Sequence, residues 1–234
     1  MPNIAIFGGT FNPVHWGHLL IAEAAIDQFQ LDRVIWVPAF RSPHKAPLLL
    51  AFEHRLEMVQ RAIADHPAFT VSDMEGQRQG TSYAIDTLTS LQALEPNACW
   101  YWIVGSDAFQ SLPRWQASQT LMARCLWLVA PRALSNEGMG WYGGDAAPEQ
   151  WVKDDNEEAK PPADRQLLPP PLAHTALLIP LPSSQPHWHQ LQTPLIGISS
   201  TLIRQRCQEG RSIRYWVPEA VRCYIAGQNL YQMS

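Results

Sequence analysis

Short apolar runs alternate with longer amphipathic segments along most of this chain, and this alternation limits the folds open to it. The expected strands are residues 3–7, 33–37, 69–72, 99–104, 124–130 and 175–180. Apolar residues recur at helical spacing in residues 15–29, 52–66, 82–94 and 199–210, and residues 217–231 predict a terminal helix that begins after Pro218. Strands that alternate with helices build βαβ units, so the pattern predicts an α/β fold with a Rossmann-like, doubly wound parallel sheet.

Residues 133–174 interrupt this alternation. They contain the glycine-rich stretch GMGWYGG, the acidic stretch DDNEEAK and the proline-rich stretch PPADRQLLPPP. Such a composition buries little apolar surface, so we expect a long surface insertion rather than a second domain. Together with the length of 234 residues, this predicts a single domain that spans residues 1–234.

Charge and cysteine usage argue against several classes of protein. The formal net charge of −4 argues against an extended, non-specific nucleic-acid surface, so no nucleic-acid partner is expected. The four cysteines are scattered and form no CxxC pair, which disfavours a disulfide scaffold or a zinc cluster and fits a cytoplasmic protein. We expect no signal peptide, no transmembrane helix and no membrane partner, whereas formation of a homo-oligomer stays open.

The stretch GGTFNPVHWGH, residues 8–18, directly follows the first expected strand. A turn at this place lies at the carboxyl end of a parallel strand, where α/β proteins bind ligands. Gly8 and Gly9 allow a close approach of the backbone, and the amides around Thr10 and Phe11 can face an anion. Neither a GxxxxGK[ST] loop nor a GxGxxG fingerprint is present, which weakens the usual kinase and dehydrogenase interpretations.

His15 and His18 lie one helical turn apart, so both imidazoles can point the same way. A catalytic zinc site would need further ligands and a nearby glutamate. The HExxH motif is absent, and Glu23 lies five positions after His18. A second alternative is a pair without function, one ring packed and one solvated. The third is phosphate handling, in which two imidazole donors beside backbone amides stabilise charge on a phosphoryl oxygen, and the upstream glycines favour it.

Residues 15–18 resemble the HxGH motif of a nucleotidyltransferase superfamily. Further stretches resemble the bacterial nicotinate-nucleotide adenylyltransferase family within it. These stretches are RSPHK (41–45), GTSYAIDTL (80–88), IVGSDAFQSLPRW (103–115), ISSTLIR (198–204) and VPEAVRCYIAGQNLY (217–231). Their order and spacing agree along nearly the whole chain apart from residues 133–174.

The resemblance implies an ATP site lined by cations and backbone amides. It gives catalytic roles to His15, His18, Lys45 and Arg204. The ATP- and phosphate-binding residues that it implies are Gly8, Gly9, Thr10, Phe11, His44, Gly105, Asp107, Ser199, Ser200 and Thr201. In this interpretation, His44 and Lys45 reach over the reacting phosphates and the Asp107 carboxylate bonds the ribose. Read without the resemblance, Ser199, Ser200 or Asp107 could be simple helix caps and Lys45 a solvated charge.

For the second substrate, the resemblance implies backbone contacts at Ser82, Tyr83 and Ala84 with a pyridine carboxylate, and stacking of Trp115 on the pyridine ring. Tyr83 and Trp115 could instead be core aromatics, since the chain has ten tryptophans. The family commonly has threonine at the position of Ala84. If the main-chain amide makes the contact, this departure costs little, but if a hydroxyl makes it, the preference for nicotinate weakens.

The reaction implied joins nicotinate mononucleotide to ATP, giving nicotinate adenine dinucleotide and pyrophosphate. Mg²⁺ is expected to accompany ATP, without metal ligands from protein side chains. Rival interpretations stay open: nicotinamide mononucleotide or phosphopantetheine as acceptor, a cytidylyltransferase, or a non-catalytic nucleotide-binding homologue.

Overall fold

The computed structural model describes residues 1–41, 43, 50–131 and 187–232. They belong to one compact unit, formed by Met1–Ser135 and Ser184–Ser234. The insertion predicted at 133–174 and the strand predicted at 175–180 lie outside the described residues. The single domain over the whole chain therefore stays a prediction.

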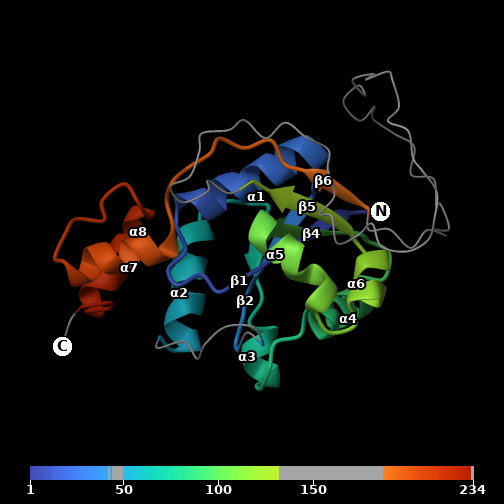
Figure 1. The fold of residues 1–234 in the computed structure, drawn as a ribbon, viewed down its shortest axis with the longest axis horizontal. Coiled ribbons are helices and arrows are strands. Elements are labelled where there is room, and N and C mark those ends of the chain that lie inside the picture. Colours follow the sequence, from blue (N-terminus) through green and yellow to red (C-terminus); the bar gives the residue numbers. More distant parts are fainter. Residues whose placement is uncertain (42, 44–49, 132–186, 233–234) are drawn as a thin grey trace, which may run out of the picture. The chain divides into compact units, whose positions relative to one another are not determined.

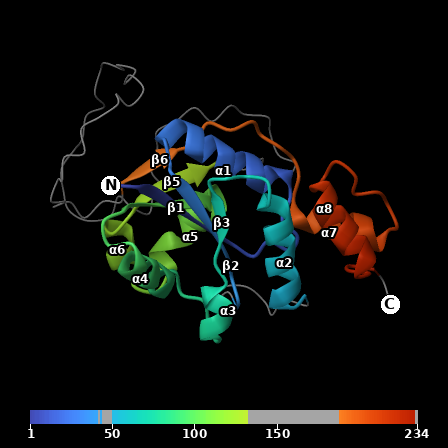
Figure 2. The same ribbon diagram turned by 180° about the vertical axis from the view of Figure 1, so that it is seen from behind.

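A six-stranded sheet, in which every pair of neighbouring strands is parallel, forms the centre of this unit (Figures 1 and 2). Its strand order is β3-β2-β1-β4-β5-β6. The strands are β1 (Asn3–Gly9), β2 (Arg33–Pro38), β3 (Phe69–Val71), β4 (Cys99–Gly105), β5 (Leu126–Ala130) and β6 (Trp188–Gln190). This is the doubly wound arrangement that the sequence predicts. The first five strands are confirmed within a few residues, whereas β6 was not predicted.

Helices connect these strands, and α1 and α4 lie on opposite faces of the sheet (Figures 1 and 2). The helices are α1 (Trp16–Phe29), α2 (Phe52–Ile63), α3 (Met74–Arg78), α4 (Ala84–Leu94), α5 (Ser106–Ser111), α6 (Ser118–Ala123), α7 (Ser200–Gln208) and α8 (Glu219–Gly227), with a 3-10 turn, η1, at Leu112–Arg114. Each amphipathic segment that the sequence predicts as helical contains one of the longer helices. The short helices α3, α5 and α6 have only five or six residues, too few to show a clear period.

The sheet has a topological switch point between β1 and β4. The chain proceeds from β1 to β2 and β3 on one side, and then from β4 to β5 and β6 on the other. In such sheets, ligands bind in the crevice beyond the carboxyl ends of the two strands at this point. Here those ends are Gly8 and Gly9 on β1 and Gly105 on β4.

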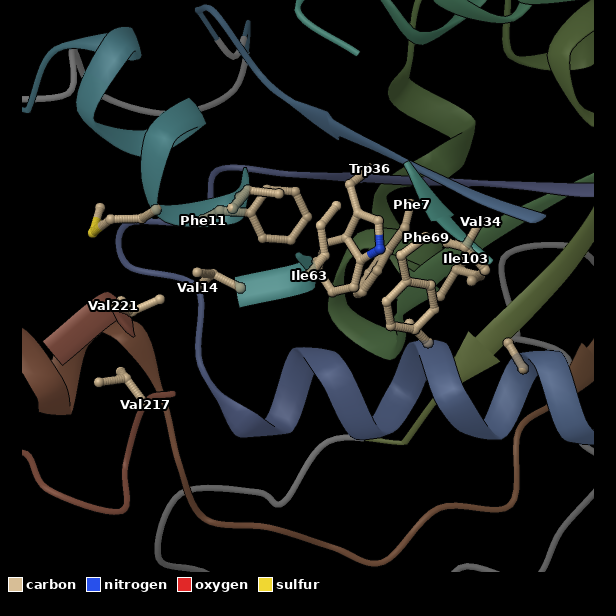
Figure 3. Close-up of a cluster of buried hydrophobic side chains, with 14 of the residues drawn as sticks. Phe7, Phe11, Val14, Val34, Trp36, Ile63, Phe69, Ile103, Val217 and Val221 are labelled. Carbon is tan, nitrogen blue, oxygen red and sulfur yellow. The ribbon is translucent and has the colours of Figure 1, made fainter. Parts of the chain in front are cut away.

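An aromatic cluster joins the core of the sheet to the turn that follows β1 (Figure 3). Trp36 on β2 is fully buried, and its ring centroid lies 4.8 Å from Phe7 and 5.3 Å from Phe11. Phe11 is only 2% exposed although its backbone has a positive φ of 49°. A left-handed conformation costs roughly 1–2 kcal/mol for such a residue, so burial of the ring offsets that cost.

The Phe11 ring leaves no room for a side chain at Gly9. A Cβ atom built on Gly9 would lie 2.8 Å from the nearest atom of that ring, closer than Cβ contacts normally come. A Cβ atom on Gly8 would lie 3.5 Å from the Trp102 ring, an ordinary van der Waals distance. The two adjacent glycines therefore have different reasons to be present, and only the second is fixed by a core side chain.

We expect Gly9→Ala to lower the free energy of unfolding by about 1–3 kcal/mol, because the new methyl group overpacks the Phe11 ring. Urea unfolding followed by circular dichroism measures the change. Gly8→Ala is the matched control and should lose clearly less stability. Equal losses in the two variants would contradict the role given to the Phe11 ring.

Candidate active site

The turn between β1 and α1, residues 10–15, is held by side chains from distant parts of the chain. Arg55 on α2 donates from Nη1 to the Thr10 carbonyl oxygen over 2.9 Å. Ser200, the first residue of α7, donates from Oγ to the Pro13 carbonyl oxygen over 2.8 Å. Buried carbonyl groups need hydrogen-bond donors, and this turn receives them from side chains.

Asn12 in the same turn is buried and bonds to two further segments. Its carbonyl oxygen accepts a hydrogen bond of 2.7 Å from Nη1 of Arg204, and its Oδ1 accepts one of 2.6 Å from the Tyr231 hydroxyl. Burial raises the pKa of the Tyr231 hydroxyl, so this group stays a protonated donor at neutral pH. The C-terminal part of the chain therefore helps to shape the turn.

His15 and His18 meet at the start of α1, as the sequence predicts. His15 is the N-cap residue and is 6% exposed, and the two rings stack with centroids 3.8 Å apart. The His15 backbone N–H donates to Nδ1 of His18 over 3.2 Å. Because Nδ1 accepts this bond, neutral His18 carries its proton on Nε2 and presents Nε2–H as a donor.

Gly17 allows the first turn of α1 to approach the His15 ring. A Cβ atom at Gly17 would lie 3.1 Å from Cε1 and Nδ1 of that ring. The middle glycine of the motif thus makes room for the stacked imidazoles. His18 also contacts Phe11 edge to face, with ring centroids 5.1 Å apart. The aromatic cluster therefore packs directly against the histidine pair.

Gly105 and Asp107 lie at the carboxyl end of β4, across the switch point from the histidines. Gly105 is the N-cap residue of α5, and Asp107 is in its first turn and is exposed. Asp107 is therefore not the N-cap residue of this helix, which was the alternative to a contact with ribose. A Cβ atom at Gly105 would meet nothing within 4 Å, so the space beside this residue is open.

The start of α7 confirms one capping prediction. Ser199 is the N-cap residue, and its Oγ accepts a hydrogen bond of 3.2 Å from the Leu202 amide. Arg204 lies one turn later and also donates from Nη2 to Oγ1 of Thr201 over 3.2 Å. Ser200 and Arg204 are thus brought to the turn after β1, and their contacts with phosphate stay a prediction.

The residues predicted to bind the mononucleotide lie at the start of α4 and after η1. Tyr83 is the N-cap residue of α4 and is 36% exposed, and Ala84 is the first residue of this helix. Trp115 is half-buried and donates from Nε1 to Ser111 Oγ over 3.0 Å. Tyr83 is therefore no core residue, whereas Trp115 lies edge-on to the buried Trp127 with ring centroids 6.3 Å apart, so a packing role for Trp115 stays open.

Ser82 forms hydrogen bonds with the segment that follows β2. Its Oγ accepts hydrogen bonds from the amides of Phe40 and Arg41, over 3.0 and 3.2 Å. Its own amide donates to the Arg41 carbonyl oxygen over 2.8 Å. His44 and Lys45 follow shortly after Arg41 in the sequence, and both lie outside the described residues.

Arg55 and Tyr231 contact the turn but were not identified from the sequence. Arg55 had a signal that could have been used, because it interrupts an apolar face of α2 that Phe52 and Val59 share with it. Tyr231 had no comparable local signal, since it meets Asn12 across 219 positions of sequence.

The described part of the chain offers little to a protein-bound metal. Among its residues, no group of three or more His, Cys, Asp or Glu side chains could hold a metal ion. No helix in the same residues is long and apolar enough to cross a membrane.

Known proteins resemble this chain along its length. The sequence model of the cytidylyltransferase-like family matches residues 6–206. A probable nicotinate-nucleotide adenylyltransferase of Nostoc sp. is 47% identical over 231 residues, which cover 99% of this chain and 98% of the relative. Its counterpart in Trichormus variabilis is 48% identical over 231 residues, with the same two coverages.

A solved structure agrees with the fold. The Plasmodium falciparum nicotinic acid mononucleotide adenylyltransferase complexed with NaAD superposes with a TM-score of 0.66. The alignment covers 99% of this chain and 98% of that chain, at 19% sequence identity. At this identity, the likeness supports the doubly wound fold and says nothing about individual side chains.

We expect Tyr231→Phe to lower the free energy of unfolding by about 1–2 kcal/mol, because buried Asn12 loses a hydrogen-bond donor. Chemical unfolding measures the loss. Tyr215→Phe is the matched control, since Tyr215 is 83% exposed and the change removes the same hydroxyl group. A Tyr231→Phe protein as stable as the control would show that this hydrogen bond contributes nothing to the turn.

Proposed function

Since the chain belongs to the nicotinate-nucleotide adenylyltransferases of the cytidylyltransferase-like family, we propose that it joins nicotinate mononucleotide to ATP. The products are nicotinate adenine dinucleotide and pyrophosphate, a step of NAD biosynthesis. The observation that carries this proposal is the stacked His15 and His18 pair, with its donor fixed on Nε2 of His18, at the switch point of the sheet.

The nucleophile is a phosphate oxygen of the mononucleotide. With a second pKa near 6, this phosphate is largely ionised at neutral pH, so no protein base has to remove a proton. The oxygen attacks the α-phosphorus of ATP in line, a new P–O bond forms, and the bond to the leaving pyrophosphate breaks. The protein must therefore align two anions and offset their repulsion.

We assign the neutralising groups to both edges of the switch point. His18 offers Nε2–H and His15 lies stacked on it. Arg204 brings a guanidinium held against the Asn12 carbonyl, and Lys45 is assigned from sequence alone. Backbone amides at Gly8, Gly9, Thr10 and Phe11, together with His44, Ser199, Ser200 and Thr201, complete the proposed phosphate site, while Gly105 and Asp107 face the adenosine.

Mg²⁺ is proposed to enter with ATP. It prefers oxygen ligands and is commonly bound through substrate phosphates, with waters and at most one or two carboxylates. The cationic side chains around the turn suit such a metal only as neighbours of the phosphates. When bound, Mg²⁺ would reduce the negative charge on the triphosphate.

Ala84 bears on the choice between nicotinate and nicotinamide. As the first residue of α4, its amide belongs to the group at a helix N-terminus that has no acceptor within the helix. This end of a helix favours a negative charge. We propose that a main-chain contact of this kind serves the nicotinate carboxylate, so that replacement of the family's threonine by alanine costs little.

A pyrophosphate-release assay with ATP and Mg²⁺ tests the proposal. Nicotinate mononucleotide, nicotinamide mononucleotide and phosphopantetheine are offered separately, and the first should give by far the highest kcat/KM. Preference for either of the others would replace the proposed acceptor, and release with none of them would indicate a non-catalytic homologue. Oligomeric state and the expected cytoplasmic location stay predictions.

We expect His18→Ala to lower kcat by about 10²- to 10³-fold, because a donor to the reacting phosphates is lost. The fold should persist, as judged by an unchanged far-ultraviolet circular dichroism spectrum. His187→Ala is the control, since this histidine is exposed and precedes the edge strand β6. A near-normal kcat for His18→Ala would refute the role assigned to Nε2.

We expect Trp115→Ala to raise the KM for nicotinate mononucleotide roughly 10-fold, because aromatic stacking on a base is worth ~1–3 kcal/mol. The KM for ATP should change much less. Trp115→Phe keeps an aromatic face and should retain most of the affinity. Initial rates at varied concentrations of each substrate separate the two effects, and equal changes in both KM values would argue against stacking.

A further inference from the structure

Arg55 is the most deeply buried charged side chain among the described residues. It is the fourth residue of α2 and is 1% exposed. Its guanidinium carbon lies 5.5 Å from the centre of the Phe52 ring. Burial lowers the pKa of the Arg55 guanidinium, an effect opposed by neighbouring groups that include Glu75. A charge is costly to bury, so its hydrogen-bond partners indicate what it contributes.

Those partners belong to the ends of two adjacent strands. Nη1 donates to the Thr10 carbonyl oxygen over 2.9 Å and to the Ala39 carbonyl oxygen over 2.7 Å. Nη2 donates to the Phe40 carbonyl oxygen over 3.3 Å. One side chain thus joins the turn after β1, where the histidines lie, to the segment that leaves β2.

Glu75 on α3 accepts a hydrogen bond from a backbone amide of the same segment, residues 39–41. It is buried, its Oε2 accepts from the Phe40 amide over 3.3 Å, and its Oε1 accepts from Oγ1 of Thr87 over 2.7 Å. Thr87 lies on α4, whose first residues are assigned to the mononucleotide. Phe40 therefore lies between a cation at its carbonyl oxygen and an anion at its amide.

We propose that Arg55 and Glu75 are positioning residues that fix residues 39–41 relative to both halves of the active site. Arg55 sets their distance from the phosphate-binding turn at Thr10, and Glu75 and Ser82 set their distance from α4. The inference rests on the proposed function, because it concerns the alignment of the two substrates that this function requires.

The planar guanidinium is needed because its two Nη atoms reach three carbonyl groups at once. A lysine would keep the charge and most of the volume, but its single nitrogen cannot reproduce that fork. Neither Arg55 nor Glu75 is assigned a contact with substrate. Their loss should therefore act on the geometry of the reacting groups and lower kcat more than it raises either KM.

Arg55→Lys is the main test, with Arg61→Lys as the matched control on the same helix. Arg61 is half-exposed, pairs with Glu57 and lies over the Tyr224 ring. We expect Arg55→Lys to lower kcat by roughly 10- to 100-fold with both KM values within about threefold of the wild type. The control should keep the wild-type kcat.

Glu75→Gln is a second, milder variant in case Arg55→Lys folds poorly. The amide keeps one acceptor oxygen but cannot accept from both Phe40 and Thr87. We expect a smaller fall in kcat. Because both residues act on Phe40, the double variant should lose less activity than the product of the two single effects.

Hydrogen–deuterium exchange provides a readout that does not depend on activity. In Arg55→Lys, exchange should rise several-fold in peptides that contain the amides of Phe40, Arg41 and Ser82, and stay unchanged elsewhere. Exchange that rises throughout the protein, with a large fall in Tm, would mean a merely structural role and would overturn the proposal. Unchanged kcat in Arg55→Lys would overturn it as well.

The two proposals can fail separately. If the wild type releases no pyrophosphate with any acceptor, the proposed function fails, and the exchange experiment alone decides whether Arg55 anchors residues 39–41. If the wild type is active and the exchange of these peptides is unchanged in Arg55→Lys, the positioning role fails while the proposed function stands.

Discussion

The turn at residues 10–15 depends on hydrogen bonds that its own backbone cannot make. The carbonyl groups of Thr10, Asn12 and Pro13 accept from side chains of α2 and α7, not from a neighbouring strand. Buried carbonyl groups without donors are costly, so the conformation of the turn requires these donors to be in place. The turn that ends in the histidine pair is therefore held in part by α7 and Tyr231, far along the chain.

In the proposed function, Arg204 would serve both this support and the phosphates. Its guanidinium donates to the Asn12 carbonyl oxygen and to Thr201, which fixes the orientation of the remaining N–H groups. A cation that is already oriented costs no reorganisation when charge develops on a phosphate. An arginine suits this double task better than a lysine, because five donors in one plane can serve a carbonyl and an anion together.

The sequence predicted the parts of the fold that have a local period. The five strands from β1 to β5 and the helices α1, α2, α4 and α7 each follow from apolar spacing, and Pro218 marks the start of α8. The strand β6 is only Trp188–Gln190, two of whose residues are polar, so it has no comparable pattern. The pairing of Tyr231 with Asn12 arises only from the tertiary fold, and no spacing rule reaches across it.

The same distinction applies to the site. The glycines and histidines of residues 8–18 could be assigned from residue type and position, because a turn after the first strand must lie at the ligand-binding edge. The separate reason for Gly9, contact with the Phe11 ring, could not be inferred, since it depends on the positive φ of Phe11. The apolar helix face around Arg55 marks it as unusual, but the carbonyl groups that it contacts cannot be identified from the sequence.

The tautomer of His18 connects the geometry to the type of reaction. Because Nδ1 accepts the His15 amide, the proton of the neutral ring lies on Nε2, and neither nitrogen is then an available base. A reaction that begins by deprotonating a hydroxyl or a water would need such a base. A mononucleotide phosphate arrives already ionised, and its attack shifts negative charge toward the leaving pyrophosphate, where an N–H donor can stabilise it. In the proposed function, the hydrogen bond at Nδ1 thus suits His18 to act as a donor to phosphate rather than as a base.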